Sequence, residues 1–209
     1  MQILLLAATA QEIRPFTDSN TGIDILISGV GMPATLYHLQ KRMQQIDYDL
    51  IIQAGIAGSF NRKIDLGQAV WVKQDALGDL GTEEKDSFSP IFDSGLADRN
   101  EFPFTNGWLV NNSEITKRIK LNGVNAVTVN KVTDSRLQEQ QIIKHFDPDI
   151  ESMEGAALHY VCLQEKVPFL QLRSISNFTG ERDKTKWKMK EAIHTLNSEL
   201  SELISGLTN

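Results

Sequence analysis

Residues 50–59 read Leu-Ile-Ile-Gln-Ala-Gly-Ile-Ala-Gly-Ser, a short apolar run that leads into a glycine-rich segment. An apolar run of this length, bounded by turn-forming residues, is typical of a strand that is buried on both faces of a sheet. The run predicts a strand over residues 50–54. Glycines directly after a strand permit either a tight turn or the close approach of the backbone to a ligand, and the segment alone leaves both interpretations open.

Similar apolar runs lie on both sides of this strand along the chain. They predict further strands over residues 3–8, 23–28, 68–72, 124–129 and 169–175. Between the runs, apolar residues recur at three- and four-residue spacing, which is typical of helices. This spacing predicts helices over residues 34–46, 135–146, 153–164 and 189–203. Strands that alternate with helices predict an α/β fold with crossover connections.

The composition restricts the class of protein. The 209 residues carry 21 basic and 27 acidic side chains, a net charge of −6, which disfavours nucleic acid as a partner. We expect a single domain over residues 1–209, and the lone Cys162 fits a reducing cytoplasm. The apolar start at residues 3–8 is too short for a membrane-spanning helix, which needs about 20 apolar residues, so we expect no membrane partner. The four histidines lack the paired spacing of metal ligands, so no metal site is predicted.

Residues 75–112 show no clear strand or helix pattern. They combine turn-forming glycines and prolines with five aromatic residues: Phe88, Phe92, Phe102, Phe104 and Trp108. A loop of this length inside a compact domain is usually functional or disordered. Because of its aromatic residues, we expect the segment to pack over a pocket or against a partner subunit.

A second glycine cluster, at residues 28–33, lies between a predicted strand and a predicted helix. It is similar to a dinucleotide-binding turn, but the third glycine of that fingerprint is missing. The glycines follow the second strand instead of the first, and no acidic residue follows about 20 residues later at the end of a clear strand. These differences disfavour a dinucleotide site.

Acidic residues stand near the predicted start of the helix over residues 153–164. A helix N-terminus favours an ionised carboxylate, so Glu151 is interpreted as a cap or a solvated charge. Glu154 precedes small residues on a helix that must pack on the sheet. It fits either a cap or a carboxylate that accepts hydrogen bonds from the two vicinal hydroxyls of a ribose.

The strand over residues 169–175 turns polar at its end, in the segment 173–177. Ligands of open α/β sheets bind outside the carboxyl ends of the strands. The polar segment is therefore a candidate site, and an ordinary strand-to-loop transition is the alternative.

Taken in order, these segments resemble a known family. Residues 10–13, 28–31, 55–58, 152–156 and 173–177 are similar to motifs of the nucleoside phosphorylase and nucleosidase superfamily, in particular of the purine nucleosidases that hydrolyse methylthioadenosine and S-adenosylhomocysteine. Within it, residues 104–111 and 176–183, together with Trp187, resemble the futalosine hydrolases of an alternative menaquinone pathway. The resemblance implies a nucleoside phosphorylase-like, three-layer α/β/α sandwich with a mixed central sheet. It also implies a homodimer or larger homo-oligomer and no cofactor.

The resemblance further implies roles for single residues. Glu12 corresponds to the general base that activates water, and Glu154 to the carboxylate that binds the ribose hydroxyls. Met153 corresponds to the apolar residue beneath the ribose, and Arg173 to an arginine near the water and Glu12. The remaining substrate contacts that it implies are Ile56, Ser176 and Phe178.

Asn177 departs from the adenine-specific members, which carry an aspartic acid that donates a proton to N7 of the base. An amide cannot serve as that acid. It can donate a hydrogen bond to a 6-oxo group and accept one from a protonated N7. Asn177 therefore favours a 6-oxopurine such as hypoxanthine, the base of futalosine, over adenine.

Gln53 is a second departure, because phosphorylases of this superfamily bind phosphate with an arginine at that position. The carboxylate of Glu12 would also repel phosphate. The residues thus favour hydrolysis of futalosine with release of hypoxanthine. The alternatives are a methylthioadenosine/S-adenosylhomocysteine nucleosidase, a 6-oxopurine nucleoside phosphorylase, and a non-catalytic nucleoside sensor.

The carboxyphenyl ketone on the 5′ side of futalosine requires a cation and an apolar wall. The candidate cations are Arg99, Arg182, Lys184 and Lys186, and the candidate walls are Phe102, Phe104, Trp108 and Phe178.

Overall fold

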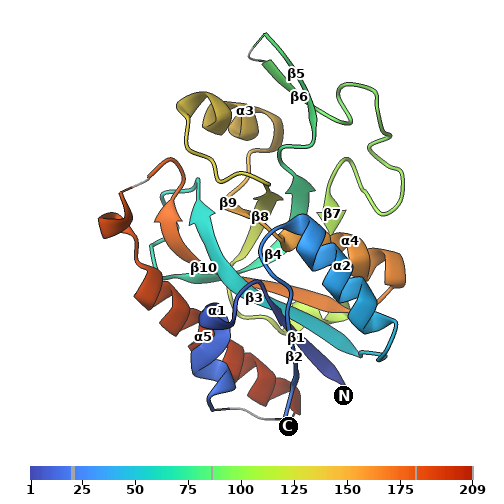
Figure 1. Ribbon diagram of the computed structural model, residues 1–209, viewed down its shortest axis with the longest axis vertical. Coiled ribbons are helices and arrows are strands. Elements are labelled where there is room, and N and C mark those ends of the chain that lie inside the picture. Colours follow the sequence, from blue (N-terminus) through green and yellow to red (C-terminus); the bar gives the residue numbers. More distant parts are fainter. Residues whose placement is uncertain (20–21, 86, 182, 209) are drawn as a thin grey trace.

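A mixed sheet with helices on both faces forms the centre of the protein (Figure 1). The computed structural model describes residues 1–19, 22–85, 87–181 and 183–208. Within these residues, the strands of the sheet are β1 (Ile3–Ala7), β2 (Asp24–Ile27), β3 (Leu50–Ser59), β4 (Ala69–Leu77), β7 (Leu109–Val110), β8 (Gly123–Thr128), β9 (Ile150–Ser152) and β10 (Phe169–Phe178). A separate hairpin consists of β5 (Gly81–Glu84) and β6 (Ser87–Pro90). The helices are α1 (Ala10–Thr17), α2 (Met32–Met43), α3 (Arg136–Phe146), α4 (Gly155–Glu165) and α5 (Met189–Thr208), with short 3-10 helices η1 (Glu114–Arg118) and η2 (Lys184–Lys186).

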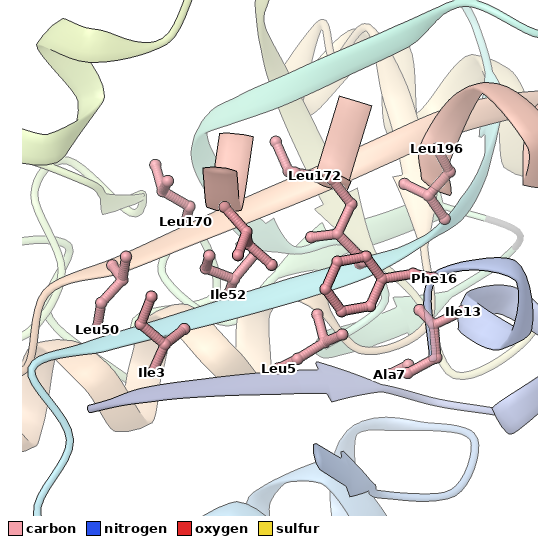
Figure 2. Close-up of a cluster of buried hydrophobic side chains, with 13 residues drawn as sticks. Ile3, Leu5, Ala7, Ile13, Phe16, Leu50, Ile52, Leu170, Leu172 and Leu196 are labelled. Atoms are coloured by element: carbon pink, nitrogen blue, oxygen red, sulfur yellow. The ribbon is translucent and has the colours of Figure 1, made fainter. Parts of the chain in front are cut away.

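The alternation of side chains along β1 accounts for the two helix layers. Ile3 and Leu5 pack in a cluster with apolar residues of α1 and α5 (Figure 2). Leu4 and Leu6 point the other way and pack in a cluster with residues of α2 and α4. Because successive side chains of a strand point to opposite faces, a continuous apolar run needs cover on both. The predicted three-layer α/β/α sandwich with a mixed central sheet is confirmed.

The sheet also closes on itself, a feature that the sequence patterns do not predict. The strand order β10-β4-β8-β9-β3 returns to its start through a parallel pairing of β3 with β10. An apolar cluster that includes Val72, Ala126 and Ile175 packs among these strands. The closure brings the carboxyl ends of β3 and β10 beside β9.

Two strands are longer than predicted. The strands expected over residues 50–54 and 169–175 continue to Ser59 and Phe178, because β3 and β10 stay paired to each other along their whole length. Glycines and polar side chains are interspersed among their last residues, so the apolar pattern ends before the backbone pairing does. These polar ends form the candidate site.

The helix predicted over residues 153–164 begins later, at Gly155, because Ile150–Ser152 form strand β9. Helix α1 is too short to show the apolar periodicity on which the other helix predictions depend. It begins with a capping box, in which Thr9 and Glu12 satisfy each other's backbone donors. No helix within the described residues is both long and apolar enough to cross a membrane.

The aromatic segment at residues 75–112 packs over α3 and α4. The rings of Phe92 and Phe104 contact each other with centroids 5.0 Å apart, and the ring of Phe104 reaches Tyr160 of α4 at 6.0 Å. The ring of Trp108 contacts Phe146 of α3 at 6.1 Å. None of the five aromatic residues of the segment lines the cavity described below. The expectation that the segment covers a pocket is therefore wrong for this cavity. Phe104 and Trp108 contact the helices instead, and Phe102 is exposed.

Candidate active site

A cavity of about 310 Å³ opens where the ends of β3 and β10 meet β9, bordered by α1 and the start of α5. Six of the predicted site residues line it: Glu12, Ile56, Met153, Glu154, Ser176 and Asn177. These residues come from four segments that are far apart in the sequence. The closure of the sheet brings them together.

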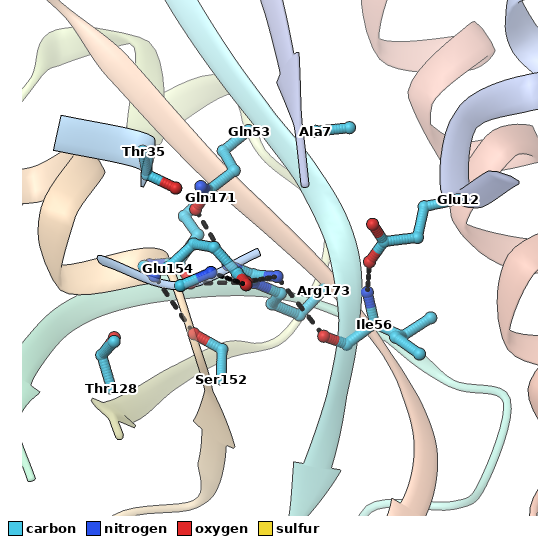
Figure 3. Close-up of polar contacts among 12 residues, drawn as sticks. Ala7, Glu12, Thr35, Gln53, Ile56, Thr128, Ser152, Glu154, Gln171 and Arg173 are labelled. Atoms are coloured by element: carbon cyan, nitrogen blue, oxygen red, sulfur yellow. Dashed lines mark hydrogen bonds and ion pairs between the residues drawn. The ribbon is translucent and has the colours of Figure 1, made fainter. Parts of the chain in front are cut away.

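The carboxylate of Glu12 is fixed on the wall of this cavity by hydrogen bonds. Its Oε2 accepts from the backbone N–H and the hydroxyl of Thr9 at 3.0 and 2.9 Å, and its Oε1 accepts from the N–H of Ile56 at 3.1 Å (Figure 3). Asn197 of α5 donates to the Glu12 carbonyl at 2.8 Å and so ties α1 to α5. The carboxylate is thus held in one place, and one lone pair, on Oε1, remains for a water molecule.

Glu154, at the start of α4, is the second carboxylate of the cavity and is 5% exposed. Its Oε1 accepts from the N–H of Gly31 at 3.0 Å, and its Oε2 lies 3.6 Å from Nη1 of Arg173. Gly31 has a φ of +94°, which favours glycine. The glycine cluster that is similar to a dinucleotide turn therefore serves here to hold a carboxylate.

Arg173 lies behind the cavity surface and is only 1% exposed. Its Nε donates to Oε1 of Gln171 at 3.0 Å, and its Nη2 donates to Oε1 of Gln53 at 2.9 Å. Its Nη1 donates to the carbonyl of Ile56 at 3.3 Å (Figure 3). All three nitrogens of the guanidinium are therefore bound by the protein, and they hold the end of β3 in place.

Gly55 lies between the side chains of Arg173 and Glu12. A Cβ at this position would collide with Nη1 of Arg173 and with Oε1 of Glu12. The guanidinium thus lies close to Glu12, as expected, although its ion pair is with Glu154. The sequence left open whether the glycine-rich segment forms a tight turn or lets the backbone approach a ligand. At Gly55 the glycine permits a close approach, but it is to side chains of the protein itself, Arg173 and Glu12.

A buried polar chain continues from Arg173 into the core. Gln171 donates to Oδ2 of Asp75 at 3.0 Å, and the hydroxyl of Thr128 donates to Oδ1 at 2.9 Å. Asp75 is completely buried, and this burial raises its pKa to about 6. Sequence reasoning missed Asp75 and Gln171, because a polar residue inside a strand gives no sign of which distant side chain it meets.

Asn177 presents part of its amide to the cavity. Its Oδ1 accepts from the hydroxyl of Ser176 at 2.7 Å, and its Nδ2 donates to the carbonyl of Phe178 at 3.0 Å. Each contact uses only half of the capacity of that atom, because an amide has two donor hydrogens and two acceptor lone pairs. One donor and one acceptor remain for a ligand.

Glu151 is a further carboxyl group on the cavity, and its expected role as a helix cap or solvated charge is wrong. It is 4% exposed because it lies on strand β9 instead of at a helix start. Its Oε1 accepts from the N–H of Thr133 at 3.2 Å, and its Oε2 has no partner among the described residues. Burial raises the pKa of Glu151 above its ordinary value. A strand of three residues leaves no periodic signal, so the sequence could not have placed this side chain.

Other expected contacts lie away from the cavity. The ring of Phe178 packs against the guanidinium of Arg62, with Cζ 4.8 Å from the ring centroid. The candidates for binding the carboxyphenyl group that are described but do not line the cavity are Arg99, Phe102, Phe104, Trp108, Phe178, Lys184 and Lys186. Arg182 lies outside the described residues. The apolar lining of the cavity comes from residues that include Val30, Val129, Val132, Trp187, Met189 and Ile193.

Within the described part of the chain, no cluster of His, Cys, Asp or Glu side chains is arranged to hold a metal ion. His159 is completely buried, and its Nδ1 lies 2.8 Å from the carbonyl of Leu109. Burial lowers the pKa of His159 to about 4, so the ring is neutral at physiological pH.

Comparison with known families identifies the fold. A model of the phosphorylase superfamily matches residues 17–207. The chain belongs to this superfamily. Among members of the superfamily, the futalosine hydrolase of Thermus thermophilus is 28% identical over 190 residues, which cover 88% of this chain and 82% of the relative. That of Streptomyces coelicolor is 29% identical over 191 residues, which cover 87% and 78%.

Solved structures of the superfamily share the whole fold. A methylthioadenosine/S-adenosylhomocysteine nucleosidase of Helicobacter pylori gives a TM-score of 0.80 at 17% identity and covers 98% of this chain and 97% of that one. The futalosine hydrolase of Helicobacter pylori gives a TM-score of 0.79 at 16% identity, with the same coverage. At these identities the likeness shows the fold alone.

Proposed function

We propose that this protein hydrolyses the N-ribosidic bond of futalosine and releases hypoxanthine, a step of the alternative menaquinone pathway. The observation that carries the proposal is the cavity that gathers Glu12, Glu154 and Asn177 in a member of the phosphorylase superfamily. Relatives that match most of the chain are futalosine hydrolases. The reaction consumes only water and needs no cofactor.

Glu12 is the general base in this proposal. Cleavage of the bond builds positive charge on the sugar, and a water molecule must attack C1′. The carboxylate of Glu12 takes the proton of that water. Its hydrogen bonds to Thr9 and Ile56 support the assignment, because they fix the carboxylate before the substrate binds.

Glu154 binds the ribose. Its two oxygens accept hydrogen bonds from the 2′- and 3′-hydroxyls, and its negative charge stabilises the cationic sugar in the transition state. Met153 provides the apolar surface beneath the ring. The hydrogen bond from Gly31 and the ion pair with Arg173 position the carboxylate for this task.

Asn177 and Ser176 recognise the base. The free N–H of the Asn177 amide donates to the 6-oxo group, and its free lone pair accepts from N7–H. This pattern favours hypoxanthine over adenine. Some relatives are methylthioadenosine/S-adenosylhomocysteine nucleosidases, but the amide disfavours that activity here.

Water is favoured over phosphate as the nucleophile. Gln53, at the position of the phosphate-binding arginine, is buried and bound to Arg173. The described lining of the cavity contains three glutamates and no lysine or arginine. A phosphate dianion would meet like charge there.

The test is to supply futalosine, inosine and methylthioadenosine, each with and without phosphate, and to follow release of the base. Release of hypoxanthine from futalosine at a rate unaffected by phosphate supports the proposal. Phosphate-dependent turnover of inosine contradicts it, and the absence of any turnover indicates a nucleoside sensor.

We also propose that the protein acts in the cytoplasm as a homodimer or larger homo-oligomer. The support is a set of exposed apolar side chains, in which Tyr37 is 61% and Val30 is 56% exposed. Tyr37 and Tyr160 line one hollow between α2 and α4, and Val30 lines the substrate cavity. A surface formed by these helices would therefore adjoin the cavity. Light scattering that gives only the monomer mass at all concentrations contradicts this proposal.

A further inference from the structure

The proposed reaction needs an acid that the residues assigned so far do not supply. A purine leaves more readily when one of its nitrogens gains a proton as the bond to the sugar breaks. Asn177 has no proton of this kind to give. The titratable side chains on the described lining of the cavity are Glu12, Glu151 and Glu154. The first serves the water and the third serves the ribose, so Glu151 is the remaining candidate.

Glu151 lies at the end of the cavity where the base is bound. The strand pairing places Asn177 of β10, Gly58 of β3 and Glu151 of β9 in one row across the sheet. Side chains in such a row lie on the same face. Glycine at the central position leaves open the space between the other two side chains. A Cβ there would lie 3.4 Å from Cγ of Glu151 and 3.5 Å from Nδ2 of Asn177.

The hydrogen bonding of Glu151 is incomplete. Oε1 accepts from the N–H of Thr133 at 3.2 Å, while Oε2 is buried and has no partner in the described part of the chain. A buried carboxyl oxygen without a partner is unfavourable, most of all when it is charged. The group is therefore suited to carry a proton on Oε2.

We propose that Glu151 is the general acid of this enzyme, which donates its carboxyl proton from Oε2 to a nitrogen of the departing purine. As the C1′–N bond breaks, its electron pair goes to the base and the proton of Glu151 neutralises the resulting charge. The water oxygen bonds to C1′, and Glu12 takes the proton that the water loses. Glu12 then releases a proton to solvent and Glu151 regains one, so one water is consumed per turnover. The inference rests on the proposed function.

The surroundings of Glu151 favour its protonated form. Burial has the largest effect on the pKa of Glu151 and raises it. The side chain and backbone N–H of Thr133 lower this pKa, and the like charges of Glu139 on α3 and Asp79 after β4 raise it, so that it lies above its ordinary value. Two further carboxylates, Glu12 and Glu154, line the same cavity as Glu151. Its neighbours in the row across the sheet, Gly58 and Asn177, carry no charge.

The test compares Glu151→Gln with the wild type on futalosine. The amide keeps the size of the side chain and an oxygen for Thr133, but it has no acidic proton. We expect kcat to fall by about 10²- to 10⁴-fold, with little change in KM. In the wild type, kcat should fall as pH rises through the pKa of Glu151. This fall is the alkaline limb of the pH–rate profile, and the variant should lack it.

Two further variants make the pH test specific. Glu139→Gln removes a like charge near Glu151 and should move the alkaline limb to lower pH. Glu114→Gln removes an exposed carboxylate that pairs with Lys117, and should change neither the rate nor the limb. An alkaline limb that persists in Glu151→Gln overturns the proposal.

A substrate with a good leaving group separates catalysis from structure. The release of 4-nitrophenolate from a 4-nitrophenyl riboside needs no protonation, so Glu151→Gln should cleave this riboside at close to the wild-type rate. Equal losses on the riboside and on futalosine overturn the proposal, and so does an unchanged rate on futalosine.

The wild type distinguishes failure of this proposal from failure of the proposed function. If the wild type cleaves another purine nucleoside instead, the futalosine assignment fails, and the same comparison is made with that nucleoside. If the wild type cleaves neither nucleosides nor the riboside, both proposals fail.

Discussion

The two carboxylates Glu12 and Glu154 have the same chemistry but different partners. Backbone and hydroxyl donors surround Glu12, whereas Glu154 meets a glycine N–H and the guanidinium of Arg173. The first arrangement leaves a base that can accept a proton from water. The second positions the carboxylate that we propose binds the ribose. The proposed division of work between them rests on these contacts.

Glu12→Gln should remove the base and keep the shape of the site. We expect kcat for hypoxanthine release to fall by about 10²- to 10⁴-fold. Calorimetry should find that futalosine binds to the variant about as tightly as to the wild type. A variant that retains the wild-type rate would exclude Glu12 as the base.

Asn177→Asp should change the preference for the base. An ionised aspartate repels the 6-oxo group, whereas a protonated one supplies the proton that adenine needs at N7. We expect the ratio of kcat/KM for futalosine to that for its 6-amino counterpart to fall by about 10- to 100-fold. Because these two substrates differ only in the base, an unchanged ratio would show that Asn177 does not select it.

Glu12, Glu154 and Asn177 could be predicted because each lies in a short segment that resembles a family motif. Glu151, Asp75 and Gln171 could not be predicted. Each is a polar residue inside or beside a buried strand. Its partners lie on other parts of the chain, and the sequence does not show which strands pair or in which register.

At the level of secondary structure, the pairing of β3 with β10 organises the site. Gln53 and Gly55 of β3 face Gln171 and Arg173 of β10 in register, so one buried network crosses both strands. Asp75 of β4 anchors the far end of this network through Gln171. The sequence predicted these strands and the polar end of β10, but it did not predict that the strands pair with each other, so the network between them could not be foreseen.

Asp75→Asn tests the anchor through stability. Folding raises the pKa of Asp75 from 3.8 to about 6, so the native state binds more protons than the unfolded state between these values. The contribution of Asp75 to stability therefore falls as pH rises from 4 to 7, by about 2 kcal/mol. Because the amide does not titrate, the stability difference between wild type and variant in urea unfolding should fall by that amount. A stability difference that is constant from pH 4 to 7 would show that folding does not raise the pKa of Asp75.

For the whole molecule, the alternation of strands and helices was sufficient to predict an α/β fold, and the family resemblance predicted its three layers. The closure of the sheet was not predictable, because β3 pairs with three strands from distant parts of the chain. This closure places α1, β3, β9 and β10 around one cavity. The catalytic proposal depends on that arrangement as much as on any single residue.

In the proposed reaction, water entering this cavity releases hypoxanthine from futalosine. The most direct measurement is one turnover of futalosine in ¹⁸O-labelled water with unlabelled phosphate present, followed by mass spectrometry of the sugar product. We predict free hypoxanthine and a sugar that carries one ¹⁸O atom at C1′. A sugar 1-phosphate without the label, or futalosine that remains intact, would exclude hydrolysis of futalosine by this protein.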